Sequence, residues 1–182
     1  MKLRFSGWLG AFLVAATVLV ALLSLVWTPY DPTLAHPDVR LAGPSAEHLL
    51  GTDRFGRDTA SRIMAGAQIT VFVGLIAVGI AALVGVPLGI LAGMRRGTWA
   101  DALVMRGADL LLAFPALLLA IIAGAVWGPS TLTAMVAIGI AGIPSFARVA
   151  RSGTLQVITQ DFISSARISA VPGWKVALRH IL

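Results

Sequence analysis

Cysteine is absent from this chain, and charged residues make up 12% of it, against about 25% in average soluble domains. Without cysteine there is no disulfide, no thiol nucleophile and no cysteine-based metal site. Lysine occurs only as Lys2 and Lys175, and neither has the Gly-Lys-Ser/Thr context of a phosphate-binding P-loop. We therefore expect no ATP hydrolysis by this chain, and no catalytic residue or cofactor site in it.

Histidine is also scarce, and its three copies are scattered. His36, His48 and His180 form neither an HExxH motif nor a paired metal spacing, and no Ser/His/Asp arrangement is credible. We interpret His36 and His48 as ordinary loop residues and His180 as a solvated or partner-facing one. No metal site and no nucleic-acid partner are expected.

Apolar residues, in contrast, make up 58% of the 182 residues, and the mean hydropathy is +0.90. A compact soluble domain of this size could not bury so much apolar surface, and disordered chains have the opposite composition. The fold class expected is all-α, a polytopic bundle of membrane helices.

The first expected membrane helix lies in residues 1–28, because residues 5–27 are uncharged and a bilayer crossing takes about 20 residues. The alternative is a cleaved signal peptide, which the length of the apolar run disfavours. Residues 29–69 form an outer loop, in which residues 59–67 are compatible with a short interfacial helix. A second membrane helix is expected at about 70–93.

Residues 110–147 are uncharged, and one helix of that length would be nearly twice as long as the hydrocarbon core is thick. The Gly and Pro at 127–130 predict a reversal there, with helices at about 108–126 and 131–147. Pro115 and Pro144 would lie inside these helices and are expected to kink them.

Three glycines at four-residue spacing mark the second helix as a packing element. Gly85, Gly89 and Gly93 form two GxxxG steps, which let a neighbouring helix approach closely. The alternative is that glycine is simply frequent in membrane helices.

The net charge of +6 is unevenly divided between the two sides of such a membrane protein. Ten cations and three acids fall on the side of the two termini, whereas four cations and five acids fall in the outer loop. The positive-inside rule therefore predicts that both ends of the chain are cytoplasmic. The four spans are free of ionisable residues except at their cytoplasmic ends, where Asp109 and Arg148 lie. This disfavours an ion-coupled carrier and means that any transport is powered by another chain.

The outer loop contains a stretch with two turn-forming glycines and two acids that can cap backbone amides. The alternative is a solvated loop of mixed charge. The residues of this outer-loop signature are Gly51, Thr52, Asp53, Gly56, Arg57 and Asp58.

A second stretch, within the predicted cytoplasmic segment 148–182, has the pattern helix, break, helix and suits docking on a soluble partner. The alternative is an interfacial amphipathic helix beside anionic lipid. The candidate docking residues of this segment are Asp161, Ser164, Ser165, Ala166, Arg167, Ala170, Arg179 and His180.

These stretches resemble one family, the inner-membrane permease subunits of binding-protein-dependent ABC importers, in the dipeptide/oligopeptide/nickel branch. Residues 51–58 are similar to its GTDxxGRD pattern, residues 109–115 to D-x-L-L-A-F-P, and residues 161–182 to its EAA loop. The resemblance extends from Trp27 to Leu182. It implies a type I importer permease fold with six core spans, of which about four are present, so residues 70–182 would be a partial transmembrane domain.

The resemblance also implies partners and a mechanism. Residues 161–182, here called the coupling loop, would bind a cytoplasmic ABC ATPase. A second permease subunit, expected to form a heterodimer, and a periplasmic or lipid-anchored substrate-binding protein would complete the importer in the inner membrane. The cargo would be peptides, nickel or a related small solute.

Two features depart from the family pattern. Ser164 replaces the usual Glu and Ala170 the usual Gly, and Pro172 is also unusual, which puts coupling in doubt. The sequence also stops where the pattern continues into two further helices. It is read as a C-terminally truncated permease, or alternatively as a non-transporting remnant or scaffold. The outer loop either faces the binding protein or stabilises the external surface.

Overall fold

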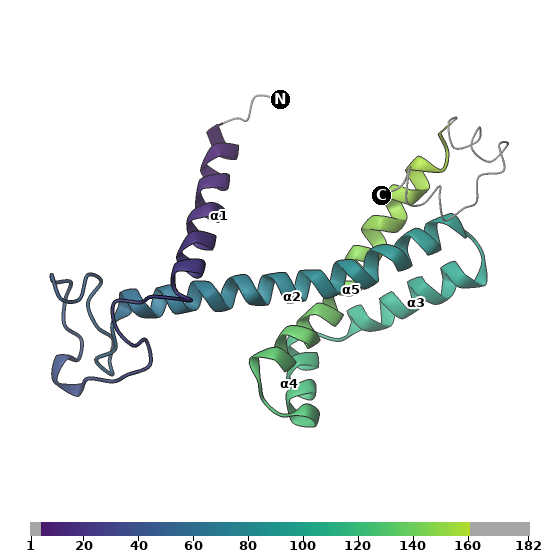
Figure 1. Cartoon of the computed structure of the whole chain (residues 1–182). Coiled ribbons are helices and arrows are strands. Elements are labelled where there is room, and N and C mark those ends of the chain that lie inside the picture. The colour runs from purple at the N-terminus through teal and green to yellow at the C-terminus, as the bar shows by residue number, and fades with distance from the viewer. Residues whose placement is uncertain (1–4, 161–182) are drawn as a thin grey trace. The chain divides into compact units, whose positions relative to one another are not determined.

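The computed structural model describes residues 5–160, and every regular element in that range is a helix (Figure 1). The all-α fold class expected from the sequence is therefore confirmed. The elements are α1 (Phe5–Leu23), a short 3-10 turn η1 (Pro37–Val39), α2 (Thr59–Met94), α3 (Trp99–Ala113), α4 (Ala116–Trp127) and α5 (Thr131–Val157).

The chain divides into two compact units, residues 1–74 and 75–182, and α2 begins in the first and ends in the second. In the first unit, the loop after α1 folds back on the start of α2. The backbone amide of Tyr30 donates to the Ser61 hydroxyl at 3.0 Å, and Thr52 and Asp58 form an isolated antiparallel bridge. The outer loop is thus anchored at both of its ends.

Two helices are longer than the sequence predicted. Residues 59–67 are the beginning of one continuous α2 of 36 residues, not a separate interfacial helix. The last helix was expected to end at 147, yet α5 continues to Val157 and includes Arg148 and Arg151. The first helix is shorter, because α1 ends at Leu23 and a turn occupies the next residues.

The helix predicted at 108–126 is divided in the structure: α3 and α4 are separate helices bent by 84° at Phe114 and Pro115, a sharper break than the kink expected at Pro115. Phe114 is extended, with φ −94° and ψ 126°. The residue before a proline is disfavoured in the α region by a clash with the proline ring, and proline itself has no amide to continue the helix. Pro87 and Pro144, by contrast, lie inside continuous helices.

Helices α2 and α5 pack in parallel within the second unit. A Cβ on Gly139 would meet Ala77 and Ile80, and one on Gly93 would meet Thr154, so residue numbers rise together along both helices. Because α2 and α5 run in the same direction, the intervening α3 and α4 carry the chain back from the end of α2 to the start of α5. The turn before α5 has Gly128 at φ +89°, and the Ser130 side chain caps the helix by accepting from the Thr133 amide at 3.0 Å.

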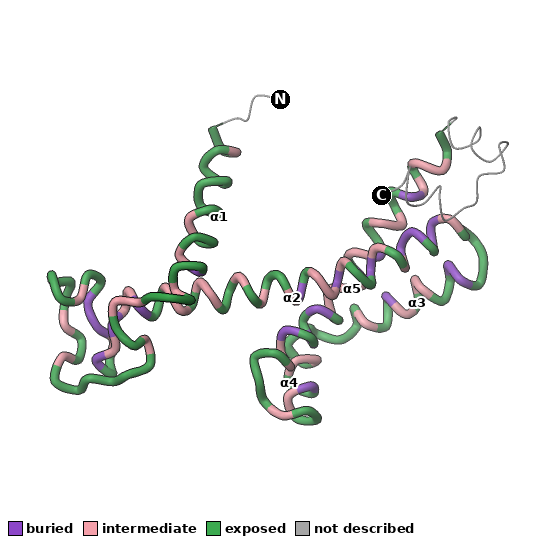
Figure 2. Tube along the Cα trace, in the orientation of Figure 1, coloured by how far each residue is buried: buried purple, intermediate pink, exposed green. Residues whose placement is uncertain are grey.

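Much of the helix surface is exposed (Figure 2), and many large apolar side chains lie on it. By length and composition α1, α2 and α5 can each cross a membrane, and the bent pair α3 and α4 adds a fourth crossing if it is one span. Small residues dominate the buried positions, among them Ala81, Ala92 and Ala147. The contacts between these helices thus depend on close approach of backbones rather than on large interlocking side chains.

Candidate functional sites: the outer loop and the helix core

Asp53 is the centre of one half of the outer loop. Its Oδ1 accepts from the backbone amides of Phe55 at 2.8 Å and Arg57 at 3.0 Å, while its Oδ2 accepts from the Arg57 and Arg62 side chains. Burial alone would raise the pKa of Asp53, but hydrogen bonds from the Arg57 amide, the Arg57 guanidinium and the Phe55 amide lower it to about 2. This carboxylate is therefore ionised and fully engaged inside the loop.

Asp58 is the centre of the other half, and its side chain is only 2% exposed. Its Oδ2 accepts from the Ser61 amide at 2.7 Å and the Ser61 hydroxyl at 2.8 Å, and its Oδ1 lies 3.0 Å from His48 Nδ1. Burial acts to raise the pKa of Asp58, but the bonds from Ser61 and His48 hold it below its ordinary value. The His48 ring also lies 4.8 Å from the Tyr30 ring, so Asp58 ties three loop segments together.

His48 corrects the sequence interpretation, which treated it as an ordinary loop residue. It is a half-buried partner of Asp58, ten residues away in the chain. The three residue types of a hydrolase triad do meet here, but Asp58 lies between His48 and Ser61, and the Ser61 hydroxyl donates to Asp58 rather than to the histidine. A histidine that does not contact the serine cannot take its proton, so this cluster is a hydrogen-bond network that stabilises the loop.

The two lowered carboxylate pKa values predict how the outer loop responds to acid. A depressed pKa contributes stability above the unfolded value of 3.8, and this contribution is lost as the pH falls through the folded value, about 2 for Asp53. Nuclear magnetic resonance signals of the Phe55 and Arg57 amides, which donate to Asp53, should stay constant from pH 7 to about 4 and shift between about 4 and 2. The Ser61 amide, which donates to Asp58, should also shift as the pH falls below 3.8. Shifts that are complete above pH 5 would contradict this assignment.

Three of the glycines of α2, Gly85, Gly89 and Gly93, lie directly against α5. A Cβ on Gly85 would lie 2.6 Å from the Ile143 carbonyl oxygen, and one on Gly89 would lie 2.2 Å from that of Ala147. A Cβ on Gly93 would lie 2.6 Å from the Cβ of Thr154. No side chain fits in these places, so the glycine spacing sets how closely the two helices approach.

Two ion pairs that the sequence analysis did not predict connect α3 to α5. The Arg151 guanidinium donates two hydrogen bonds to the Asp101 carboxylate, from Nε to Oδ1 at 2.7 Å and from Nη2 to Oδ2 at 2.9 Å. Arg148 pairs with Asp109 through Nη2, but both side chains are more than half exposed. The earlier residue of α3, Asp101, pairs with the later residue of α5, Arg151, and Asp109 pairs with Arg148. Helices α3 and α5 are therefore antiparallel. No acid lies near either arginine in the sequence, and only the folded chain shows the pairing.

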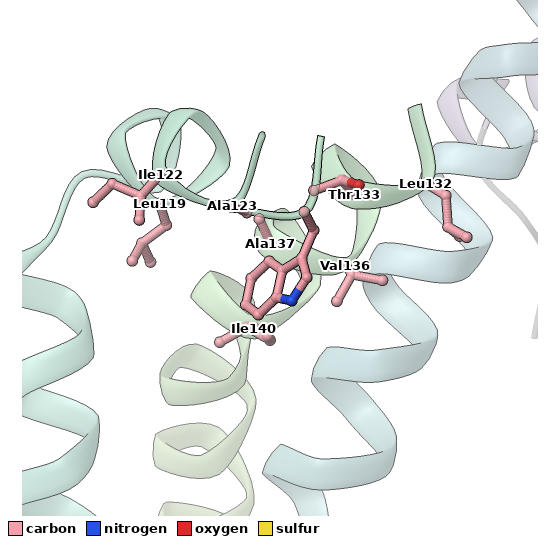
Figure 3. A pocket seen from close by; sticks show the side chains of 9 residues that line it. Leu119, Ile122, Ala123, Leu132, Thr133, Val136, Ala137 and Ile140 are labelled. Carbon is pink, nitrogen blue, oxygen red and sulfur yellow. The ribbon is translucent and has the colours of Figure 1, made fainter. Parts of the chain in front are cut away.

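Helices α4 and α5 form an apolar groove of about 450 Å³ near the turn that joins them (Figure 3). Among the described residues that line this groove, only Thr133 carries a hydroxyl group. The other lining residues are Leu119, Ile122, Ala123, Trp127, Leu132, Val136, Ala137 and Ile140. In residues 5–160 no cluster of three or more histidine, aspartate and glutamate side chains could hold a metal ion.

The predicted coupling-loop residues lie outside the described residues, which end at 160. They follow α5 directly in the sequence, with three residues between Val157 and Asp161. The residues concerned are Asp161, Ser164, Ser165, Ala166, Arg167, Ala170, Arg179 and His180.

Comparison with known proteins gives a family for more than half of the chain. Residues 85–182 match the family described as "Binding-protein-dependent transport system inner membrane component". This region begins at the first glycine of the α2–α5 contact and includes α3, α4 and α5.

Similar proteins carry names of one kind. The chain is 39% identical over 173 residues to the dipeptide transport system permease protein DppC of Alkalihalophilus pseudofirmus, covering 95% of this chain and 57% of that protein. It is 41% identical over 176 residues to the glutathione transport system permease protein GsiD of Pectobacterium atrosepticum, covering 93% and 58%. It is 37% identical over 172 residues to the probable D,D-dipeptide transport system permease protein DdpC of Escherichia coli, covering 92% and 57%. The chain thus spans less than two thirds of the length of these relatives.

Proposed function

Because this chain belongs to the family of binding-protein-dependent transport system inner membrane components and is a multi-pass membrane protein, we propose that it is the permease subunit of an ATP-driven importer. The observation that carries the proposal is the family match over residues 85–182, which includes the α2–α5 contact and both ion pairs. In this proposal the chain is not an enzyme: it forms part of the path, and a partner hydrolyses ATP.

The parallel packing of α2 and α5 supports four crossings of the membrane. Both helices are long and apolar enough to span, and the contacts from Ala77–Gly139 to Gly93–Thr154 keep them in one register. If both cross in the same direction, the bent pair α3 and α4 has to return across the bilayer. Together with α1, this gives the four-span topology that the sequence analysis expected.

The orientation proposed places both ends of the chain in the cytoplasm, because most of the cations lie on that side. The absence of cysteine makes this directly testable. A single cysteine at exposed Ala46 in the outer loop should react with a membrane-impermeant maleimide added to intact cells. One at exposed Thr98, at the end of the turn between α2 and α3, should react only after the membrane is opened. The reverse pattern would contradict the orientation.

The partners proposed are a cytoplasmic ABC ATPase, a second permease subunit and a substrate-binding protein at the outer face. The expected spans also support an external energy source, because their only ionisable residue is Asp109, which lies near a helix end and pairs with Arg148. The coupling loop, Asp161 onward, is the proposed contact for the ATPase.

We infer that the outer-loop signature mainly stabilises the external surface. Asp53 and Asp58 have their oxygens engaged by neighbouring loop residues, and Gly51 and Gly56 take the positive φ angles of tight turns. Carboxylate oxygens that already accept hydrogen bonds within the loop have few acceptor positions left for a partner protein. A binding protein would instead meet outward residues such as Phe55, whose ring is flanked by the guanidinium groups of Arg54 and Arg57 at 4.9 and 4.8 Å.

The proposed cargo is a short peptide, because the three relatives above are named for dipeptides, D,D-dipeptides and glutathione. None of these three names mentions nickel, the alternative of the sequence analysis. The test is uptake of labelled alanyl-alanine and of labelled glutathione by cells that lack or regain this protein. Uptake of at least one should require both the protein and cellular ATP. Equal uptake of both in the two strains would contradict the proposal.

A further inference from the structure

The last three turns of α5 fit between α2 and α3. On one face, Thr154 is fully buried and its Cβ and methyl group occupy the space above Gly93. On another, Arg151 reaches Asp101 near the start of α3. This end of α5 therefore contacts both neighbouring helices within one turn, and it is also the end from which the chain continues into the coupling loop.

The Asp101–Arg151 pair holds α3 and α5 in a defined relative orientation. Its two parallel bonds fix the orientation of the planar guanidinium, which a single contact would not do. Asp101 also accepts from the Gly97 amide at 3.0 Å, so the turn between α2 and α3 is attached to the same carboxylate. The Asp101 side chain is only 9% exposed, whereas both members of the Arg148–Asp109 pair are open to the surroundings. An exposed pair contributes little, but breaking a desolvated pair leaves an uncompensated charge.

We propose that Asp101 and Arg151 are positioning residues that make the end of α5, the start of α3 and the α2–α3 turn move as one body when the coupling loop is displaced. This group, Asp101 with Arg151 and the Gly97 amide, is called the α3–α5 joint. The inference rests on the proposed function, because it assigns the route by which an ATPase acting on the loop moves the membrane helices. The contact between Thr154 and Gly93 keeps the same end of α5 packed on α2. Helix α3 therefore moves with α5 only while the hydrogen bonds of the α3–α5 joint are intact.

The test separates assembly from coupling in the complete transporter. We compare Arg151→Gln with the wild type, with Arg106→Gln as control, since Arg106 is an exposed cation of α3 without an ion pair in the described part of the chain. Three quantities are measured: copurification of the ATPase subunit, its ATP hydrolysis, and uptake of labelled alanyl-alanine and glutathione. We expect Arg151→Gln to retain copurification and hydrolysis within about twofold while uptake per ATP falls at least tenfold, and Arg106→Gln to match the wild type.

Two further variants keep the inference testable if Arg151→Gln assembles poorly. Arg151→Lys keeps the positive charge but cannot form the two parallel hydrogen bonds, so uptake per ATP should be intermediate between the wild type and Arg151→Gln. The exchange Asp101→Arg with Arg151→Asp restores attraction across the joint, and should recover a substantial part of the uptake per ATP that either single change loses. Recovery by exchange would not be expected if the pair had no role in coupling.

Three outcomes would overturn the role proposed for the α3–α5 joint, and only the third would also overturn the proposed function. Unchanged uptake per ATP in Arg151→Gln would show that the pair carries no displacement. A parallel loss of copurification and uptake that the exchange does not repair would assign the pair to assembly alone. Absence of any ATPase from the wild-type complex would overturn the proposed function together with the joint, whereas the first two outcomes leave that function intact.

Discussion

Replacing Gly89 by alanine should separate α2 from α5 and lower the stability of the helix core by about 1–3 kcal/mol, the usual cost of overpacking. The new Cβ would lie 2.2 Å from the Ala147 carbonyl oxygen and 2.8 Å from the Ala150 Cβ. The first of these is backbone in the middle of a helix, so it cannot rotate away as a flexible side chain would. Thermal unfolding of the purified protein in detergent, followed by circular dichroism, should show the loss as a lower midpoint.

Gly79→Ala is the matched control, because Gly79 lies on the same helix and within the same unit. A Cβ there would meet nothing within 4 Å among the residues that the structure describes. Alanine is the better helix former by about 1 kcal/mol in water, so this change should leave the midpoint unchanged or raise it. A midpoint for Gly89→Ala equal to that for Gly79→Ala would mean that α5 does not lie on this face of α2.

The helical architecture was predictable where local chemistry decides it. Uncharged runs located the helices, and the Gly and Pro near residue 128 located the turn, where Gly128 now has a positive φ. A kink was expected at both Pro115 and Pro144, but it was not predictable that only Pro115 would end a helix, because Pro87 and Pro144 also lie within predicted helices and leave them continuous. At Pro87 and Pro144 the helix continues beside close helix contacts, which the sequence alone does not reveal.

The extent of α5 and the contacts of its arginines were missed for a related reason. Two cations were taken as the end of the apolar helix, because unpaired charges are costly inside a membrane protein. In the structure both are paired, Arg148 with Asp109 and Arg151 with Asp101, at separations of 39 and 50 residues. A pattern of single residues cannot show such long-range pairs. The same applies to His48, whose partner Asp58 becomes its neighbour only when the loop closes.

The outer loop offers the second large effect, because Gly56→Ala combines backbone strain with a collision. Gly56 has φ +77°, and a Cβ there would lie 1.7 Å from the His36 carbonyl oxygen. The left-handed conformation alone costs about 1–2 kcal/mol for a residue with a side chain, and the collision adds to it. A total of roughly 2–3 kcal/mol would raise the open population of the loop about 30- to 150-fold. Trypsin should then cleave faster after Arg54 and Arg57.

Gly43→Ala in the same loop is the control for this change. Gly43 does not have a positive φ, and within the described part of the chain a Cβ there would meet nothing within 4 Å. Its cleavage rate should therefore match that of the wild type. Because Asp53 and Asp58 hold the segments on either side of Gly56, opening should also release their hydrogen bonds, and the acid-dependent amide shifts of Phe55 and Ser61 should disappear in Gly56→Ala but persist in Gly43→Ala. Equal cleavage of the two variants would show that the loop is not closed through Gly56 and His36.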